Sequence, residues 1–584
     1  MRDGRRRDGL PEGRGHPVAE RIEFGPFRLD TGKRVLWRGR DLVSVPPKAL
    51  DLLVALVEQR GDVVSKQDLL SRVWPDTFVE EANLSVNASI LRKVLGTQED
   101  GRAYLENVPR RGYRFVAETR AQAEVGPPSL AVLPFRRLGG TADDDYLGLG
   151  MADALIARLG RGGHVVVRPT RAVLKYADLA ADPIVAGREL AVDAVLDGTV
   201  QRDGARLRVS TQLLPVGRAL SSWSATFETT FTSLFAVQDA VAEQVARALA
   251  LTLDAPDPSR AAPPARPPAT EAYQAYLKGR YFWNRLTREG VGKAFEYFEE
   301  AKARDEAWAL PWSGLADAYA VLGFTGFVTP KDAWPMAIEA AEGALARDPE
   351  LPEARVTLGL VRLFQDWDWR AAEEELERAL ALDPHSAAAH HWYALFLMMR
   401  GRAAEARRHL ERATDVDPLS VIVATMRGFE RDLSRDFTAS EGEYRKALEL
   451  DPHHFLGQWG MGMALQHLNR HADAVAVHER AAAALEHAPF VQAVLARSLA
   501  LAGRTDEARA MLAALEDPEG AYVSPYQRAT VHEALGDRTA ALGCLEEAAE
   551  PRDAWLVWID VDPMLDGMRD EPRFAAVRAR VMGA

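Results

Sequence analysis

The chain has 584 residues, of which 47% are hydrophobic and 27% are charged, with a net charge of −13. This length and composition indicate several globular domains and exclude a fibrous or wholly disordered protein. Its single cysteine, Cys544, excludes a disulfide framework, and the lack of any run of about 18 apolar residues predicts no membrane-spanning helix, so we expect a cytoplasmic setting.

The acidic net charge hides a basic N-terminal part. Residues 1–120 hold 22 Lys and Arg against 18 Asp and Glu, a net of +4, so the remaining residues carry −17. Nucleic acid therefore stays among the possible partners of the N-terminal part. Residues 1–21 lack the apolar segment of a secretory signal, and we expect a flexible tail.

Residues 22–118 predict short strands, three helices and a hairpin, in that order. The strand-like segments are Ile22–Leu29, Arg34–Arg38 and Asp41–Val45. Apolar residues at helical spacing predict helices over Ala49–Gln59, after Ser65 as an N-cap, and over Val79–Leu95. The hairpin surrounds Arg110, Arg111 and Gly112.

The helix over Val79–Leu95 is the most informative element, because its two faces differ in chemistry. The face expected in the core carries Leu84, Ala88, Leu91 and Leu95. The other face is small, polar and basic, which suits the major groove of DNA, while hairpin arginines suit phosphates or the minor groove. We therefore predict DNA contacts by Asn83, Val86, Asn87, Ser89, Ile90, Arg92, Lys93, Arg110, Arg111 and Tyr113. Arg114 is as well suited to bracing the hairpin.

These residues resemble the OmpR/PhoB-type winged helix-turn-helix over nearly all of residues 22–117. The matching segments are Leu50–Leu53, Leu69–Trp74, Leu91–Gly96 and Arg111–Phe115. The resemblance implies a recognition helix and a wing that bind double-stranded DNA. The domain is placed first in the chain, as in CadC- and ToxR-like regulators. Its wing has Val-Pro-Arg-Arg-Gly where phosphorelay members have Val-Arg-Gly-x-Gly.

Residues 127–254 predict a small α/β domain. Its strands are expected at Ser129–Phe135 and in a hairpin of Val195–Val200 and Arg206–Leu214, and its helices at Tyr146–Leu159 and Leu234–Leu251. The segments AVLPF, YLGLGMADALIARL and LFAVQDAVAEQVA resemble a TolB-N-terminal/FlgO-like domain. We expect this domain to couple the two ends of the chain or to dimerise.

Residues 255–270 are rich in Pro and Ala and predict a linker, and residues 271–584 are repetitive. Asp-Pro recurs at positions 348, 383, 417 and 451, at intervals of 35, 34 and 34. A period of 34 is typical of tetratricopeptide repeats, which stack into a superhelix with a concave groove. We expect about eight units, with an insertion near Gly326–Pro330 and a terminal cap over Trp555–Val581. The turns between helices are predicted at Gly401, Arg435, Asn469, Gly503 and Gly536.

Motifs for catalysis or metal binding are incomplete. Gly290–Lys293 lacks the Gly and the Ser or Thr of a phosphate-binding loop, since Thr287 and Ala294 occupy those positions. Asp143–Asp145 lacks the Gly and Glu of a calcium loop. We therefore expect no catalytic residue, no cofactor and no metal. Aromatic residues of the repeats, such as Trp392, Tyr393 and Trp459, are expected mostly in the core, with a minority lining the groove.

The sequence thus predicts a multidomain, mainly α protein that acts as a one-component bacterial transcriptional regulator. Its expected partners are double-stranded DNA and a protein, peptide or ligand bound by the repeats, with a homodimer on DNA as an option and no membrane. One alternative is a repeat scaffold that the DNA-binding domain only tethers. Another is an enzyme hidden in the α/β domain.

Overall fold

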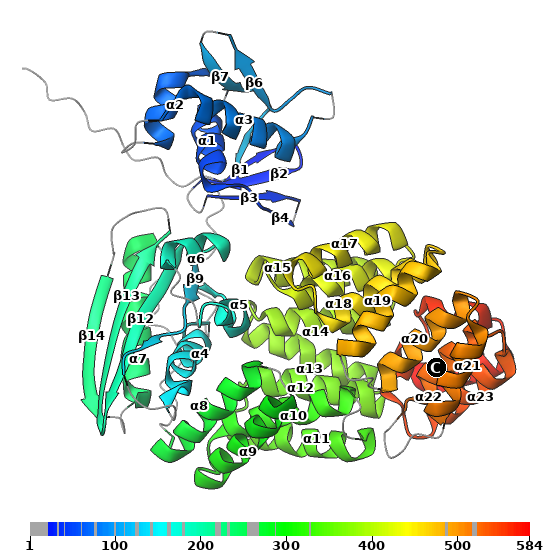
Figure 1. Cartoon of the computed structure of the whole chain (residues 1–584). Coiled ribbons are helices and arrows are strands. Elements are labelled where there is room, and N and C mark those ends of the chain that lie inside the picture. The colour runs from blue at the N-terminus through cyan, green and yellow to red at the C-terminus, as the bar shows by residue number, and fades with distance from the viewer. Residues whose placement is uncertain are drawn as a thin grey trace, which may run out of the picture. The chain divides into compact units, whose positions relative to one another are not determined.

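A computed structural model divides the chain into two compact units, Met1–Gly126 and Pro127–Ala584 (Figure 1). It describes residues 21–583 apart from 32–33, 40, 60, 75–78, 99–100, 110, 123–127, 140–143, 161–164, 178–181, 217–222, 231–233, 254–267, 286–287, 326–328, 485–488 and 517–522. Residues 1–20 of the predicted tail, nearly all of the predicted linker, Arg110 and most of the predicted insertion lie outside the described residues. The last residue of the predicted tail, Arg21, belongs to the first strand. The domain boundaries of the sequence analysis stay predictions.

The first unit opens with an antiparallel sheet in the order β4-β3-β2-β1-β8. The segment predicted as one strand, Ile22–Leu29, is two strands, because Gly25 adopts φ 51° and turns the chain. The strands are β1 (Arg21–Phe24), β2 (Phe27–Asp30), β3 (Val35–Arg38), β4 (Asp41–Val43) and β8 (Arg120–Gln122).

Three helices and a second sheet complete the first unit. The helices are α1 (Pro47–Val57), α2 (Lys66–Val73) and α3 (Glu81–Leu95), and the strands are β5 (Val63–Ser65), β6 (Leu105–Val108) and β7 (Gly112–Phe115). The predicted N-cap is present, since the Ser65 hydroxyl accepts a hydrogen bond from the Asp68 amide at 3.1 Å. Strand β5 was not predicted. It pairs with β7, so the hairpin becomes a three-stranded sheet in the order β5-β7-β6.

The second unit begins with an α/β segment. Its sheet has the order β11-β9-β12-β13-β14, with β10 also paired to β12. The predicted hairpin is β12 (Ala194–Asp203) and β13 (Arg206–Pro215), and β13 alternates buried and exposed residues as expected. The other strands are β9 (Ser129–Val132), β10 (Arg136–Arg137), β11 (Val166–Val167) and the unpredicted β14 (Trp223–Thr230). The helices are α4 (Tyr146–Gly160), α5 (Thr170–Leu174), α6 (Pro183–Glu189) and α7 (Leu234–Leu253).

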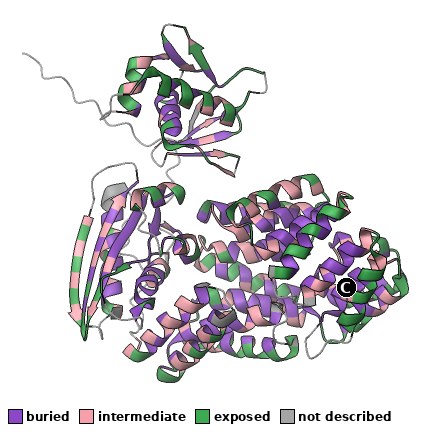
Figure 2. Ribbon diagram, viewed as in Figure 1, coloured by how far each residue is buried: buried purple, intermediate pink, exposed green. Residues whose placement is uncertain are grey.

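Sixteen helices from α8 to α23 follow as eight consecutive antiparallel pairs among the described residues. Each turn predicted between two helices of a unit has a residue with positive φ: 68° at Gly401, 59° at Arg435, 58° at Asn469, 79° at Gly503 and 80° at Gly536. Figure 2 shows buried and exposed positions side by side on these helices, as expected for elements that each pack on two neighbours.

The bounds of the paired helices are α8 (Thr270–Arg285), α9 (Arg288–Arg304), α10 (Ala309–Thr325), α11 (Pro330–Arg347), α12 (Pro352–Val361), α13 (Trp369–Leu382), α14 (Ala387–Met399), α15 (Ala403–Val416), α16 (Val421–Leu433), α17 (Phe437–Leu450), α18 (Phe455–His467), α19 (His471–Ala484), α20 (Pro489–Leu501), α21 (Thr505–Glu516), α22 (Pro525–Ala534) and α23 (Arg538–Ala549). A π-helical turn, η4 (Arg362–Asp366), extends α12.

The α/β segment and the repeats share buried contacts within the second unit. The Asp153 carboxylate on α4 accepts hydrogen bonds from the Arg280 guanidinium on α8 at 2.9 and 3.0 Å, and Asp153 is 5% exposed. The Arg168 guanidinium, 3% exposed, donates to the carbonyl oxygens of Asp415 and Val416 at the end of α15. The buried Arg168 and the half-buried Arg280 therefore join the α/β segment to different repeats.

The last part of the chain folds back onto the repeats. We name residues 553–582 the C-terminal segment; it holds the 3₁₀ helices η5 (Ala554–Trp558) and η6 (Pro563–Met568) and helix α24 (Pro572–Met582). The Trp369 indole on α13 donates to the carbonyl oxygen of Val581 at 2.9 Å, across 212 residues of sequence. The segment predicted as a terminal cap thus also packs against repeats far earlier in the chain, within one hydrophobic cluster.

Candidate nucleic-acid interface

Helix α3 has one buried face and one exposed face. The buried face consists of the four residues predicted for it, Leu84, Ala88, Leu91 and Leu95. The opposite face is exposed at the predicted positions Asn83, Val86, Ser89 and Lys93, and also at Ser85. Val86 is 58% exposed although its side chain is apolar. An exposed valine between polar residues suits contact with a thymine methyl group in the major groove.

Three of the residues on α3 that were predicted to contact DNA make contacts with other groups of the protein. The Asn87 amide donates to the carbonyl oxygen of Asn83 at 2.8 Å. Arg92 is half-buried, and its Nε donates to the carbonyl oxygen of Leu105 at 3.3 Å. The prediction that Ile90 is an exposed apolar residue is wrong. Ile90 is half-buried against the core, because the buried face of the helix is wider than its four central residues.

The hairpin is positioned by a close approach between β7 and β5. Gly112 pairs with Ser65 and has φ 150°. A Cβ atom at Gly112 would lie 1.9 Å from the carbonyl oxygen of Val64, so a larger residue would push the hairpin off the sheet. Glycine at this position therefore sets where the start of β7 and the adjacent Arg111 lie.

The arginines of the hairpin have different surroundings. The Arg114 Nη2 atom lies 2.6 Å from the Glu106 carboxylate on β6, so Arg114 braces the two strands, the alternative left open by the sequence. The side chain of Arg111 is exposed at the turn, and that of Lys93 is exposed on α3. Neither of these two cations has a carboxylate partner within the described part of the chain, which leaves both available for phosphate groups.

Tyr113 was also predicted to contact DNA, and this contact stays a prediction, but the side chain lies almost entirely in the core. Tyr113 is 3% exposed, and its ring packs in the core beside Arg92, whose guanidinium lies 5.9 Å from the ring centroid. Strand alternation accounts for the difference, because Tyr113 and Phe115 share the core side of β7. The Tyr113 hydroxyl lies 3.5 Å from the hydroxyl of Ser85. Ser85 was not among the residues predicted for the exposed face of α3, because it directly follows the core residue Leu84.

The resulting surface combines hydrogen-bonding, apolar and cationic groups on two rigid elements. Helix α3 presents Asn83, Ser89 and Val86, and the hairpin presents Arg111. Amide and hydroxyl groups bind base edges, while cations bind phosphates, so the arrangement has both kinds of group that a DNA-reading helix needs. Among the described residues, no three His, Cys, Asp or Glu side chains are grouped so as to hold a metal ion.

Two family models match the chain. Residues 39–115 match the family described as Transcriptional regulatory protein, C terminal, and residues 363–427 match Tetratricopeptide repeat. The first match spans α1 to β7 and hence the whole surface described above. The second spans the repeats from η4 into α16. None of the described helices is both long and apolar enough to cross a membrane.

Two curated relatives are regulators. The chain is 25% identical over 412 residues to the transcriptional regulator HilA of Salmonella typhimurium, covering 69% of this chain and 72% of HilA. It is 35% identical over 79 residues to the transcriptional activator CadC of Escherichia coli, covering 13% of this chain and 15% of CadC. The solved DNA-binding domain of CadC is 22% identical and covers 18% of this chain and 97% of that domain, with a TM-score of 0.17.

The sequence comparisons establish the domain content. The chain carries a DNA-binding domain of the OmpR/PhoB type in its N-terminal part and a tetratricopeptide region, which is the composition of a transcriptional regulator.

Proposed function

We propose that this protein is a one-component regulator that binds promoter DNA through α3 and the β6–β7 hairpin and receives a protein or ligand signal through its repeats. The exposed face of α3 is the observation that carries the proposal. Asn83, Val86 and Ser89 are exposed together on the side opposite a fully packed core face. A face of this composition suits base reading in the major groove. Lys93 and Arg111 add cations for phosphate groups on α3 and on the hairpin.

The proposal includes a coupling role for the α/β segment. Arg168 and Arg280 tie this segment to α15 and to α8. A change in the packing of the repeats therefore changes contacts of the α/β segment directly. Strand β14 is the last strand of its sheet, and its residues are half-buried or exposed throughout (Figure 2). A homodimer on DNA, formed through this segment, is compatible with the proposal.

The direct test maps the DNA that the full chain binds across the genome of the organism that encodes it, and measures the transcripts of the adjacent genes. We expect discrete promoter sites, loss of those sites in a Lys93→Ala/Arg111→Ala double variant, and altered transcription of the genes beside them. The Arg114→Ala variant is the matched control, because Arg114 pairs with Glu106. Binding that is uniform along the genome, or sites without any transcriptional change, would contradict regulation.

The alternative function is a scaffold that DNA only tethers. In a regulator, removing or mutating the repeats changes DNA affinity or transcription in response to a signal. In a tethered scaffold, both stay unchanged, and only recruitment of the partner is lost. Deletion of residues 271–584 separates the two, with the DNA occupancy and the transcripts measured together.

A further inference from the structure

A pocket lies where the C-terminal segment meets the repeats. Residues of α16, α18, α20, α22, η5 and η6 line it. The pocket has a cavity volume of about 30 Å³. One water molecule needs roughly 10–15 Å³ on this measure, so the cavity has room for a small chemical group. Its lining includes Phe429, Asp432, Trp459, Arg497 and Trp558.

Aromatic rings form one wall of the pocket. The ring of Phe429 lies 5.8 Å from that of Trp459 and 5.1 Å from that of Trp558, between ring centroids. Trp555 stands edge-on to Trp459 at 5.6 Å. Four contiguous aromatic rings around a cavity provide the negative ring faces that attract an organic cation.

A buried carboxylate also lines the pocket, one helical turn after Phe429. Asp432 on α16 is 1% exposed. Its Oδ2 atom accepts a hydrogen bond from the Tyr444 hydroxyl at 2.8 Å, whereas Oδ1 accepts none from the described residues. A buried carboxylate oxygen without a donor is costly, since it has lost its water and gained no partner. A ligand that donates a hydrogen bond to Oδ1 removes this cost.

Two carboxylates and one guanidinium line the pocket, those of Asp432, Asp562 and Arg497. The Arg497 guanidinium is already opposed by Glu533, with Nη2 and Oε2 3.7 Å apart. Burial raises the pKa of Asp432 to about 7 and also raises the pKa of Asp562. A bound cation stabilises the ionised form of Asp432, so amine binding should be stronger above pH about 7 than below it.

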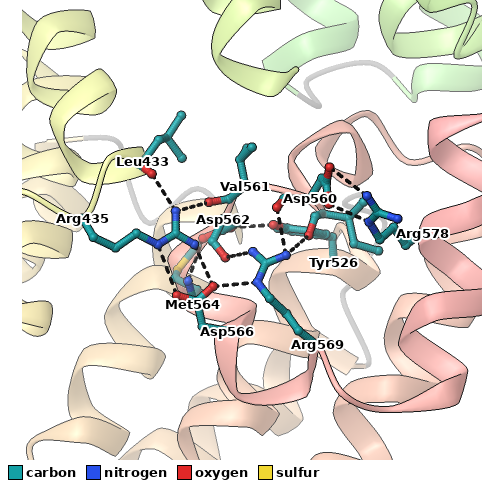
Figure 3. A network of polar contacts seen from close by, with 11 residues as sticks. Leu433, Arg435, Tyr526, Asp560, Val561, Asp562, Met564, Asp566, Arg569 and Arg578 are labelled. Atoms are coloured by element: carbon teal, nitrogen blue, oxygen red, sulfur yellow. Dashed lines mark hydrogen bonds and ion pairs between the residues drawn. The ribbon is translucent and has the colours of Figure 1, made fainter. Parts of the chain in front are cut away.

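The wall contributed by the C-terminal segment is fixed by the polar network in Figure 3. Arg435, at the turn after α16, and Arg569 both donate to the Asp566 carboxylate at 2.7 Å. The Tyr526 hydroxyl on α22 donates to Asp562, which lines the pocket. The pocket is therefore built from elements held together by ion pairs and is not a loose gap between helices.

We infer that this pocket binds methylammonium, the smallest alkylammonium ion. The ammonium group donates to Oδ1 of Asp432 and lies against the aromatic rings, and the methyl group fills the rest of the cavity. The binding of the amine does not depend on the proposed function. Only the further idea that the amine is the signal received by the repeats rests on that function.

Isothermal titration calorimetry of the full chain with methylamine tests the inference, with methanol as the neutral isostere and formate as the anion. We expect saturable binding of methylamine and no comparable binding of the other two. The Arg497 Nε and Trp459 Nε1 atoms, which have no acceptor among the described residues, make formate the relevant competitor. Binding of methanol or formate as tight as that of the amine overturns the inference, and so does the absence of amine binding.

Two variants and one control locate the site. Asp432→Asn keeps the shape and the Tyr444 contact but removes the charge, and it should weaken amine binding at least about tenfold. Trp459→Leu should weaken it severalfold by removing an aromatic face. Glu374→Gln removes one exposed carboxylate on α13 and should change nothing. Circular dichroism checks that each variant is folded, and unchanged affinity in both pocket variants contradicts the assignment.

A parallel measurement of DNA affinity separates this inference from the proposed function. If the amine binds and DNA affinity stays the same, the pocket stands and the amine is not a signal acting on DNA binding. If the amine binds while the chain shows no affinity for DNA, the proposed function fails and the pocket stands. If DNA binds and the amine does not, only the pocket assignment fails.

Discussion

At the scale of residues, Asn83 and Ser89 differ from Lys93 in what they contribute to DNA recognition. An amide or hydroxyl group distinguishes base edges, whereas an ammonium group attracts any phosphate. Asn83→Ala and Ser89→Ala should each alter the preferred base at one or two positions, by roughly 1–3 kcal/mol of discrimination. Lys93→Ala should weaken binding to all sequences alike.

Selection from a randomised DNA pool with each variant measures this difference. Ser71→Ala is the matched control, because Ser71 is an exposed serine on α2 whose hydroxyl donates to the Asp68 carbonyl within that helix. Identical preferences for the wild type, Asn83→Ala and Ser89→Ala would mean that specificity comes from the hairpin or from DNA shape.

The pocket carboxylate makes a second prediction at the residue scale. Burial raises the folded-state pKa of Asp432 to about 7, above the ordinary aspartate value of 3.8. The stabilisation that the protonated carboxyl gives is therefore complete below pH about 4 and is lost as the pH rises through about 7. Asp432→Asn cannot ionise, so its stability relative to the wild type should increase between pH 4 and pH 8, by on the order of 2–4 kcal/mol.

Urea unfolding of the wild type and the variant across this pH range checks the prediction. His467 and His478 titrate with the opposite sign, because burial lowers the pKa of each to about 4, so their stabilisation is lost as the pH falls. Both proteins contain these histidines, so the difference between them isolates Asp432. A stability difference that does not vary with pH would show that Asp432 has an ordinary pKa.

Sequence periodicity predicted the burial of residues at the centre of a helix's core face. It was less successful for residues at the edge of that face and in the hairpin. The core face of α3 was correct at all four positions, because a period of 3.6 fixes which side chains point inward. Ile90 and Tyr113, both predicted to contact DNA, are half-buried and buried respectively. Their burial depends on what packs beside the helix and beneath the hairpin, and these contacts come from residues distant in sequence.

At the scale of elements, the hairpin and α3 have separable roles. Arg111 is exposed at the turn, and Arg114 pairs with Glu106. Arg111→Ala should weaken binding to all DNA sequences and reduce the salt dependence by about one phosphate contact. Arg114→Ala removes the same charge but should leave the salt dependence unchanged and lower the stability of the hairpin.

Titrations of both variants against one DNA fragment at several salt concentrations distinguish the two arginines. An equal loss of salt dependence in both variants would mean that the wing acts only through its net charge. Thermal unfolding of the same two proteins shows whether the loss of the Arg114–Glu106 pair affects folding, as the geometry requires.

The elements that escaped prediction are short or depend on a partner strand. Strand β5 has only three residues, too few for an alternating pattern, and it exists because Gly112 lets β7 approach it closely. The repeats were predictable for the opposite reason. Their turns need positive φ at a fixed interval, and the sequence repeats glycine, asparagine or arginine at those positions.

At the scale of the whole molecule, the described residues show how distant segments meet within the second unit. The contact between Trp369 and Val581 spans 212 residues, and the Arg168 contact with Val416 spans 248. Repeat periodicity predicts contacts between consecutive units only. Sequence patterns therefore could not predict that the C-terminal segment folds back or that a pocket lies beneath it. Trp459, which lines this pocket, was among the aromatic residues of the repeats that the sequence singled out.

The central claim is that the N-terminal unit binds DNA, and the salt dependence of its affinity tests this most directly. A fragment of residues 1–126 is titrated against a genomic DNA pool at salt concentrations from about 50 to 200 mM. Displacement of counterions by Lys93, Arg111 and the other cations predicts a linear fall of log affinity with log salt. A folded fragment with no salt-sensitive affinity for any DNA in the pool would contradict the account.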